Sequence, residues 1–279
     1  MKIAVLSGKG GTGKTFVSVN LVAASSNAVY VDCDVEEPNG YIFFKPQELI
    51  TQNVSVKIPV VDPNKCDGCR KCVEFCKFNA LAYIGGKIII FDDVCHSCGG
   101  CVLLCPQKAV SEKEKVIGKI ETGISENVKA ITGILNTGEA SGVPIIKKLI
   151  DDISSNCNLN IIDCPPGSAC VVMESIKDAD YCILVAESTI FGTHNLNMVY
   201  ELIRLFKKPF GVVLNKCIDG ENPSEEFCIK HSIPILERIP FCSELGKANS
   251  NGLIAVREIP KYKELFSALL GKVSKEVQG

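Results

Sequence analysis

Residues 2–15 read Lys2-Ile3-Ala4-Val5-Leu6-Ser7-Gly8-Lys9-Gly10-Gly11-Thr12-Gly13-Lys14-Thr15. The apolar residues 2–6 predict a short buried strand, and residues 16–24 predict the helix that follows. Between them, residues 8–15 match the phosphate-binding pattern G-x₄-G-K-[ST]. Glycines let backbone N–H groups point into an anion-binding nest, and the helix start adds partial positive charge. A flexible glycine-rich turn is the alternative. The flanking strand and helix favour a nucleotide site, in which Lys14 reaches the terminal phosphates and Thr15 ligates Mg²⁺.

A cysteine ladder occurs twice, with the copies 29 residues apart. The copies are Cys66-x₂-Cys69-x₂-Cys72-x₃-Cys76 and Cys95-x₂-Cys98-x₂-Cys101-x₃-Cys105-Pro106. This spacing is typical of segments that hold two [4Fe–4S] clusters, with zinc or disulfides as alternatives. Residues 60–111 resemble bacterial two-cluster ferredoxins, in which the fourth cysteine of each run reaches the other cluster. We therefore expect two ligand sets: Cys66, Cys69, Cys72 and Cys105 for one cluster, and Cys95, Cys98, Cys101 and Cys76 for the other.

The phosphate-binding loop carries an additional early lysine, Lys9. The stretch Lys9-Gly10-Gly11-Thr12-Gly13-Lys14-Thr15 resembles the deviant Walker A loop of the MinD, ParA and Mrp ATPases, a group that includes the nitrogenase iron protein. The resemblance implies that Lys9 crosses a dimer interface and contacts the nucleotide bound by the partner subunit. It also implies that the active form is a homodimer with ATP and Mg²⁺ sandwiched between the subunits, and that Lys9 and Lys14 act in ATP hydrolysis.

Three downstream stretches resemble the same family. Residues 28–34 (Ala-Val-Tyr-Val-Asp-Cys-Asp) predict a buried strand ending in two acids, which alternation places on one face at the carboxyl edge of the sheet. By resemblance, Asp34 positions the attacking water and Asp32 supports the magnesium shell. Residues 160–167 resemble the Walker B strand and switch II, with Asp163 near Mg²⁺ through water. Residues 210–216 resemble the base-recognition strand, in which Asn215, followed by Lys216, contacts adenine. A simple turn is the alternative there.

The fold class expected is α/β: a doubly wound, mostly parallel P-loop NTPase sheet with an inserted α+β two-[4Fe–4S] ferredoxin-like domain. Further strand-like runs occur at 181–186 and 235–239, and helix-like runs occur at 143–153 and 196–206. We place the discontinuous ATPase domain at residues 1–58 and 112–279 and the insert at residues 59–111. Pro59, Pro63 and the charged run 111–115 mark the seams. Such an insertion is tolerated when the ends of the insert lie close together.

Composition limits the setting. The chain has 279 residues, 46% of them hydrophobic, and a net charge of −2, which gives no general attraction to nucleic acid or anionic membranes. No signal-peptide layout or membrane-spanning run is present in the sequence, so we expect a cytoplasmic protein without stable membrane insertion. Half of the sixteen cysteines belong to the ladders. The others follow no ladder and read as small apolar residues of a reduced protein: Cys33, Cys157, Cys164, Cys170, Cys182, Cys217, Cys228 and Cys242.

Two minor features have competing interpretations. Residues 261–277 predict an amphipathic helix, which by resemblance to MinD could bind a membrane but which we expect to pack on the sheet. Cys170 lies seven residues after Asp163, the offset at which the nitrogenase iron protein carries a cluster ligand. The second cysteine that such a bridging site needs is absent from residues 135–143. Cys170 is therefore expected to be a packed or interfacial thiol, with a redox role as the sharper alternative.

Two classes of function remain open. In the first, ATP-driven dimerisation is coupled to electron transfer, or to iron–sulfur or metallocentre assembly, on an unidentified partner protein. In the second, the chain is a spatial or assembly regulator of the MinD or ParA kind, whose clusters are structural or sensory. The complete ferredoxin-like unit, together with the lack of a basic DNA-binding arm, favours the first class.

Overall fold

The computed structural model describes residues 1–153 and 159–278, so Cys157 lies outside the described residues. Within these ranges the chain forms a nine-stranded sheet in the order β11-β10-β9-β1-β8-β2-β7-β6-β3. The seven strands from β11 to β7 are parallel to one another, and β6 and β3 are antiparallel additions at one edge. The expected mostly parallel α/β sheet is thus confirmed. The strands are β1 (Lys2–Leu6), β2 (Ala28–Asp32), β3 (Gln47–Val61), β6 (Val110–Ser125), β7 (Val128–Leu135), β8 (Leu159–Asp163), β9 (Tyr181–Glu187), β10 (Phe210–Cys217) and β11 (Ile235–Pro240).

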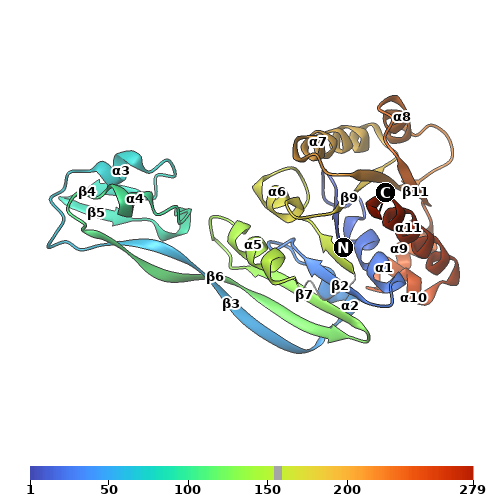
Figure 1. The fold of residues 1–279 in the computed structure, drawn as a ribbon, viewed down its shortest axis with the longest axis horizontal. Helices are drawn as coiled ribbons and strands as arrows, with labels where there is room; N and C mark the ends of the chain where they lie inside the picture. Colours follow the sequence, from blue (N-terminus) through green and yellow to red (C-terminus); the bar gives the residue numbers. More distant parts are fainter. Residues whose placement is uncertain (154–158, 279) are drawn as a thin grey trace.

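Helices cover both faces of this sheet (Figure 1). The central strands are near-continuous apolar runs because side chains on both of their faces are buried, as parallel sheets require. Two apolar cores result, one on each side of the sheet. One core includes α5 (Val143–Asp152), α6 (Cys170–Ile176), α7 (Ile190–Phe206) and α8 (Pro223–Lys230). The other includes α1 (Lys14–Ala24), α2 (Gly40–Phe44), α9 (Ser243–Ser250), α10 (Ala255–Glu258) and α11 (Pro260–Gln278).

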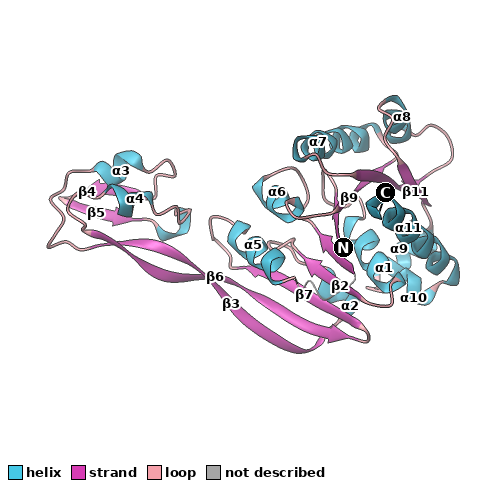
Figure 2. Cartoon of the chain, in the orientation of Figure 1, coloured by secondary structure: helices cyan, strands magenta, loops and turns pink. Residues whose placement is uncertain are grey.

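The strands β3 and β6 form a long antiparallel ribbon that leaves the body of the molecule (Figure 2). Strand β6 pairs with β7 over residues 118–125, whereas residues 110–116 of β6 pair with β3. The predicted seams lie inside this ribbon, where Pro59 is the register partner of Glu112. The ends of the insert are therefore adjacent. The ribbon is continuous through the charged run 111–115, so this run is a paired strand as well as a predicted seam.

A small unit closes the far end of the ribbon (Figure 1). It contains α3 (Lys71–Phe75), β4 (Leu81–Ile84), β5 (Lys87–Ile90), the 3₁₀ turn η1 (Asp92–Val94) and α4 (Gly100–Leu104). Its backbone repeats with the same 29-residue offset as the cysteines. Positive φ angles occur in three matched pairs: Gly68 and Ser97, Arg70 and Gly99, and Asn79 and Lys108. The duplication read from the cysteines is thus also present in the backbone conformation.

The C-terminal helix α11 packs against the body. Tyr262, Phe266, Leu269 and Val273 are buried in the core that also contains α1, and Phe16 makes an edge-on contact with Phe266. The apolar face that suggested a membrane alternative is therefore covered. Within the described residues, no helix is both long and apolar enough to cross a membrane.

Candidate nucleotide and cluster sites

The carboxyl ends of five parallel strands meet at one edge of the sheet. Strand β1 leads into the phosphate-binding loop, β2 ends at Asp32, β8 ends at Asp163, and β9 ends at Glu187. Strand β10 carries Asn215 near its end. Open α/β sheets bind ligands at this edge, where the order of strands reverses. Sheet topology therefore gathers the predicted nucleotide residues, although they are scattered over more than two hundred positions.

The phosphate-binding loop is held by its own side chains and by β10. Gly11 and Gly13 have φ angles of +80° and +92°, a region that glycine enters without strain. The Thr12 hydroxyl donates to the carbonyl of Lys9 at 3.0 Å, and the Asn215 amide donates to the carbonyl of Thr12 at 2.8 Å. The loop borders a cavity of about 420 Å³ that residues 9–16 line together with Asp34. This cavity brings together residues 9–15 of the predicted loop, whereas the buried Gly8 does not line it.

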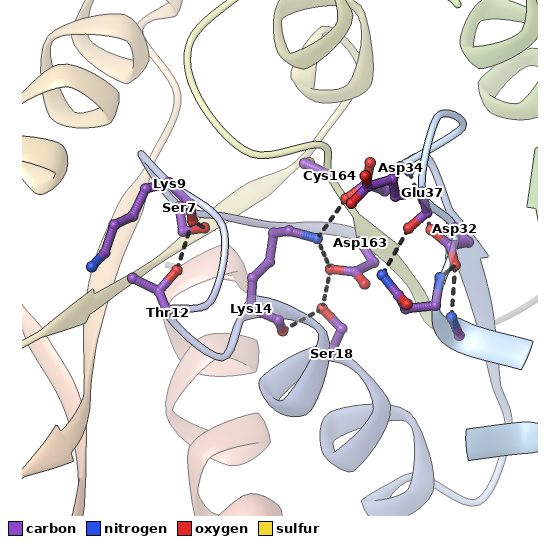
Figure 3. Close-up of polar contacts among 12 residues, drawn as sticks. Ser7, Lys9, Thr12, Lys14, Ser18, Asp32, Asp34, Glu37, Asp163 and Cys164 are labelled. Carbon is purple, nitrogen blue, oxygen red and sulfur yellow. Dashed lines mark hydrogen bonds and ion pairs between the residues drawn. The ribbon is translucent and has the colours of Figure 1, made fainter. Parts of the chain in front are cut away.

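Lys14 points away from solvent toward the end of β8 (Figure 3). Its ammonium donates to Asp163 Oδ1 at 2.7 Å, and Asp34 Oδ2 lies 4.0 Å away. Ser18 also donates to Asp163 Oδ1, at 3.0 Å, and the buried Tyr30 hydroxyl donates to Asp163 Oδ2 at 2.8 Å. Burial alone would lower the pKa of Lys14, but the charge of Asp163 and its hydrogen bond raise it above the usual value. Lys14 is thus cationic and is held by Asp163.

The acids that follow β2 differ in surroundings. Asp32 is fully buried, and its carboxylate accepts the backbone N–H groups of Asp34, Asn39 and Gly40. Burial, with a further contribution from the charge of Asp163, raises the pKa of Asp32 to about 7. Burial likewise raises the pKa of Asp34 to about 6, although Lys14 acts in the opposite direction. Asp32 therefore shapes the loop that carries Asp34, a role that the sequence did not indicate, and Asp34 lines the cavity.

The charge balance fits a divalent cation near these groups. Three carboxylates, Asp32, Asp34 and Asp163, face a single buried ammonium, so added positive charge is favourable. Thr15 and Asp34 both line the cavity and offer the oxygen ligands that Mg²⁺ prefers. Asp163 and Asp32 already accept several hydrogen bonds, which suits them to an outer position. The predicted magnesium roles of all four residues remain predictions.

Lys9 points away from the acidic cluster (Figure 3). Its ammonium pairs with Glu187 Oε2 at 2.7 Å and lies 5.0 Å from the centre of the Phe191 ring. Lys216 pairs with the other oxygen of Glu187 at 2.7 Å and donates to the carbonyl of Gly11 at 2.7 Å. Burial alone would raise the pKa of Glu187, but hydrogen bonds from Lys216 and Lys9 lower it. Glu187 was missed at the sequence level, although its position directly after a buried strand could have marked it.

A second cavity adjoins the loop on the side of β10. It has about 160 Å³ of free space and is lined by residues that include Gly11, Asn215, Lys216 and Phe241. Gly11, Gly13 and Phe16 line both cavities, so the two are neighbours. A planar base beside the phosphate cavity would meet the amide of Asn215. The cavity thus lies where the predicted contact between Asn215 and adenine requires it.

Two further cavities lie in the small unit, and each is lined by one predicted ligand set. Cys76, Cys95, Cys98 and Cys101 line a cavity of about 150 Å³. Cys66, Cys69, Cys72 and Cys105 line a narrower one of about 10 Å³. The fourth cysteine of each ladder therefore faces the other ladder's cavity. Equivalent backbone N–H groups donate to these sulfurs: Ala80 to Cys76 Sγ at 3.4 Å and Ala109 to Cys105 Sγ at 3.3 Å.

The donor chemistry of these cavities fits an iron–sulfur cube. Burial raises the pKa of the Cys72, Cys95 and Cys101 thiols, so cluster binding must displace their protons. Among the described residues, no three His, Cys, Asp or Glu side chains approach closely enough to hold one metal ion. Four cysteines around one cavity suit a cluster that offers each thiolate a different iron.

Cys170 is exposed at the first residue of α6, whereas Cys164 is buried beside β8. Cys170 is therefore an accessible thiol, and the expectation that it is packed is wrong. Its interfacial and redox roles remain predictions.

Comparisons with known proteins give the following matches. A family model described as the CobQ/CobB/MinD/ParA nucleotide binding domain matches residues 3–256. The uncharacterised protein MJ0579 from Methanocaldococcus jannaschii is 31% identical over 221 residues, which are 77% of this chain and 80% of that protein. The uncharacterised protein MJ0578 from the same organism is 29% identical over 277 residues, which are 98% of this chain and 96% of that protein.

Solved structures share the fold. The cell division ATPase MinD from Pyrococcus furiosus has a TM-score of 0.61 at 20% identity and covers 98% of each chain. The septum site-determining protein MinD from Pyrococcus horikoshii, complexed with Mg-ADP, has a TM-score of 0.61 at 19% identity, with 98% of this chain and 96% of that chain covered.

A ferredoxin from Methanothermococcus thermolithotrophicus is 35% identical over 57 residues, which are 19% of this chain and 95% of that protein.

Proposed function

Because the chain belongs to the CobQ/CobB/MinD/ParA nucleotide-binding domain family, we propose that it is an ATP-hydrolysing iron–sulfur protein. In this proposal ATP binding joins two copies, and the joined state drives electron transfer or metallocentre assembly on a partner protein. The observation that carries it is the placement of the eight ladder cysteines, which line two cavities in the predicted sets of four. The ferredoxin match, and the Mg-ADP complex of a protein with the same fold, support the two halves of the proposal.

The nucleotide-binding part of the proposal depends on Lys14, which exchanges Asp163 for a phosphate of ATP as its partner. Asp163 neutralises the Lys14 ammonium at 2.7 Å. The γ-phosphate of ATP is a stronger local anion, so its arrival at the loop moves Lys14 toward the phosphate. Thr15 and Asp34 would hold the Mg²⁺ that accompanies ATP, with Asp163 and Asp32 in outer positions, and the ion would supply charge neutralisation for the phosphates.

Hydrolysis requires a group that orients the attacking water. Asp34 lines the phosphate cavity, and its pKa of about 6 leaves it mostly ionised at neutral pH. A carboxylate at this position can accept a hydrogen bond from water in line with the γ-phosphate. Lys9, now held by Glu187, is the residue proposed to cross to the partner subunit's nucleotide.

The redox half rests on the small unit. The [4Fe–4S] clusters would supply one-electron transfer, at a potential that their surroundings determine. This chain's own part is to hold the thiolates, to donate the Ala80 and Ala109 N–H groups to sulfur, and to limit water around the larger cavity with Phe75 and Phe78. N–H donors stabilise the charge of a thiolate and so tune a bound cluster.

The test is anaerobic purification, iron and sulfide analysis, and electron paramagnetic resonance of the dithionite-reduced protein. The spectrum is recorded without nucleotide, with MgATP and with a non-hydrolysable analogue. We expect about eight iron atoms per chain, as two four-iron cubes require, and a cluster signal or midpoint potential that changes with nucleotide. Cys72→Ser should lose one cluster, whereas Lys14→Ala should keep the iron and lose nucleotide binding. If the signals and midpoint potentials of both clusters do not change with nucleotide, the result would instead favour a spatial or assembly regulator of the MinD or ParA kind, in which the clusters are structural or sensory.

A further inference from the structure

The charged run in β6 reaches from the ribbon to the turn that precedes the second cysteine ladder. Strand alternation puts Lys113 and Lys115 on one face of β6. Lys113 Nζ lies 3.6 Å from Asp92 Oδ2, and Lys115 Nζ lies 2.9 Å from Asp93 Oδ1. Both acids belong to η1, whose Asp92 carbonyl accepts the backbone N–H of Cys95 at 3.3 Å. These lysines therefore tie the ribbon to the backbone that carries Cys95.

Lys115 also has a partner in the nucleotide-binding body. Its ammonium lies 2.9 Å from Glu139 Oε2, in the loop between β7 and α5. The Lys115 and Glu139 side chains are only 18% and 12% exposed, so this half of the bridge is shielded from solvent. The Asp93 side chain is 80% exposed, which makes the other half sensitive to salt. Lys115 thus links the nucleotide-binding body to the small unit through two ion pairs. The pair with Glu139 is shielded from solvent, and the pair with Asp93 is open to it.

The loop that carries Glu139 is attached to the residue that follows Asp34. The Leu135 N–H donates to the carbonyl of Val35 at 2.8 Å. The Val35 side chain packs so closely against Gly133 and Gly142 that a methyl group at either glycine would lie within 2.7 Å of it. Val35 therefore contacts both ends of the loop that carries Glu139.

The position of Lys115 along the ribbon explains why one side chain matters. The pairing of β6 with β7 stops at Gly118, and residues 110–116 pair with β3. A two-stranded ribbon alone twists easily and is marginally stable. Asn136 of the body still donates to the carbonyls of Ile117, at 2.9 Å, and Val116, at 3.3 Å. Lys115, the next residue along β6, adds an ion pair with Glu139 to this attachment.

We propose that Lys115 is a positioning residue that couples the nucleotide site to the cluster cavity lined by Cys95. Nucleotide binding moves Asp34 and Val35, the loop carrying Glu139 follows, and Lys115 transmits the shift to Asp93 and the turn before Cys95. This inference rests on the proposed function, because it assigns the route by which ATP binding reaches the clusters.

The test is hydrogen–deuterium exchange of the full-length, cluster-containing protein under anaerobic conditions, with and without Mg²⁺ and adenylyl imidodiphosphate. In the unsubstituted protein we expect nucleotide to change exchange at residues 8–16, 136–142 and 92–98. At residues 92–98 the change should be about fivefold or more, the lower end of typical coupling between sites. In Lys115→Met the change at 92–98 should disappear, while the changes at 8–16 and 136–142 remain. Glu139→Gln should give the same pattern.

Lys119→Met is the matched control. Lys119 lies on the same strand but pairs with Glu121, a neighbour within β6, at 2.6 Å. This variant should retain all three changes in exchange. In the unsubstituted protein, raising the salt concentration should weaken only the change at residues 92–98. Persistence of that change in Lys115→Met would overturn the inference while leaving the proposed function intact. Failure of nucleotide to protect residues 8–16 in the unsubstituted protein would overturn both.

Discussion

Replacing Lys14 with methionine should destabilise the nucleotide-free protein, and the loss should grow with pH. Methionine keeps most of the side-chain length but removes the cation that Asp163 binds at 2.7 Å and Asp34 faces at 4.0 Å. Lys14 and Asp163 are 7% and 1% exposed, so no solvent replaces the lost partner. Breaking a buried ion pair by removing one partner costs about 3–5 kcal/mol. For a chain of this size each kcal/mol lowers Tm by about 2–4 °C.

The pH dependence follows from the acids after β2. The charge of Lys14 lowers the pKa of Asp32 and Asp34, which burial nevertheless raises to about 7 and about 6. Without Lys14 both pKa values rise further above those of the unfolded chain. A carboxyl group with a raised folded-state pKa contributes stability at low pH that is lost as pH rises through that pKa. The deficit of the variant should therefore be smaller at pH 6 than at pH 8.5, and the difference should be about 1.4 kcal/mol for each unit by which the pKa values rise further.

Thermal unfolding followed by far-ultraviolet circular dichroism at pH 6 and pH 8.5, without nucleotide, measures this deficit. Lys9→Met is the control, since Lys9 is 29% exposed and Glu187 keeps Lys216 as a partner. Loss of this pair should cost about 0–1 kcal/mol with little pH dependence, because Lys216 still neutralises Glu187. A Lys14→Met deficit that is equal at both pH values, or no larger than that of Lys9→Met, would refute the reasoning.

Three further variants test separate parts of the molecule. Lys9→Ala should leave ATP binding within about threefold, because Lys216 still neutralises Glu187 and the lost pair adds little stability. It should abolish ATP-dependent dimerisation in size-exclusion chromatography, because it removes the side chain proposed to reach the partner subunit's nucleotide, and native turnover would contradict that role. Cys72→Ser should halve the iron content and make residues 62–109 sensitive to protease, since cluster binding is coupled to folding; intact iron would reject the ligand assignment. Gly40→Ala should lower stability by about 1–3 kcal/mol in thermal unfolding, because a methyl group there would lie 2.0 Å from the buried Tyr30 ring, and an unchanged Tm would contradict this packing.

The body of the fold could be predicted because its signals are local. The apolar runs at β1, β8, β9 and β10 are buried on both faces and stand out from the polar segments around them. The ribbon could not be predicted in this way. Residues 47–53 of β3 are all exposed, and Pro59 and the charged run 111–115 resemble a linker. Its strands exist because β3 pairs with β6 across a long stretch of intervening chain, a non-local contact that periodicity does not encode.

Sequence motifs indicate the residues that belong to them. They do not indicate the residues that hold those side chains in place. Lys14 and Asp163 follow from the loop and strand patterns, yet their joint contacts with Ser18 and Tyr30 do not. Tyr30 lies in an apolar strand, and only the rule that a buried tyrosine hydroxyl needs a partner could have marked it. The supporting role of Asp32 in the magnesium shell stays a prediction, and the three backbone N–H groups that donate to its carboxylate could not be read from the sequence. Such partners depend on how the loop after β2 closes, which composition and spacing do not reveal.

The attachment of the small unit also bears on ancestry. The Asp62 N–H donates to the Ala109 carbonyl at 2.8 Å, and Val61 is the register partner of Val110. The chain thus enters and leaves this unit through neighbouring positions, which a short turn joins in an ordinary hairpin. In evolutionary terms the end of the ribbon is an insertion site. A gene segment encoding a module with adjoining termini can be gained or lost there in one event. The strands that carry the phosphate-binding loop need no change, so each half of such a chain can diversify on its own.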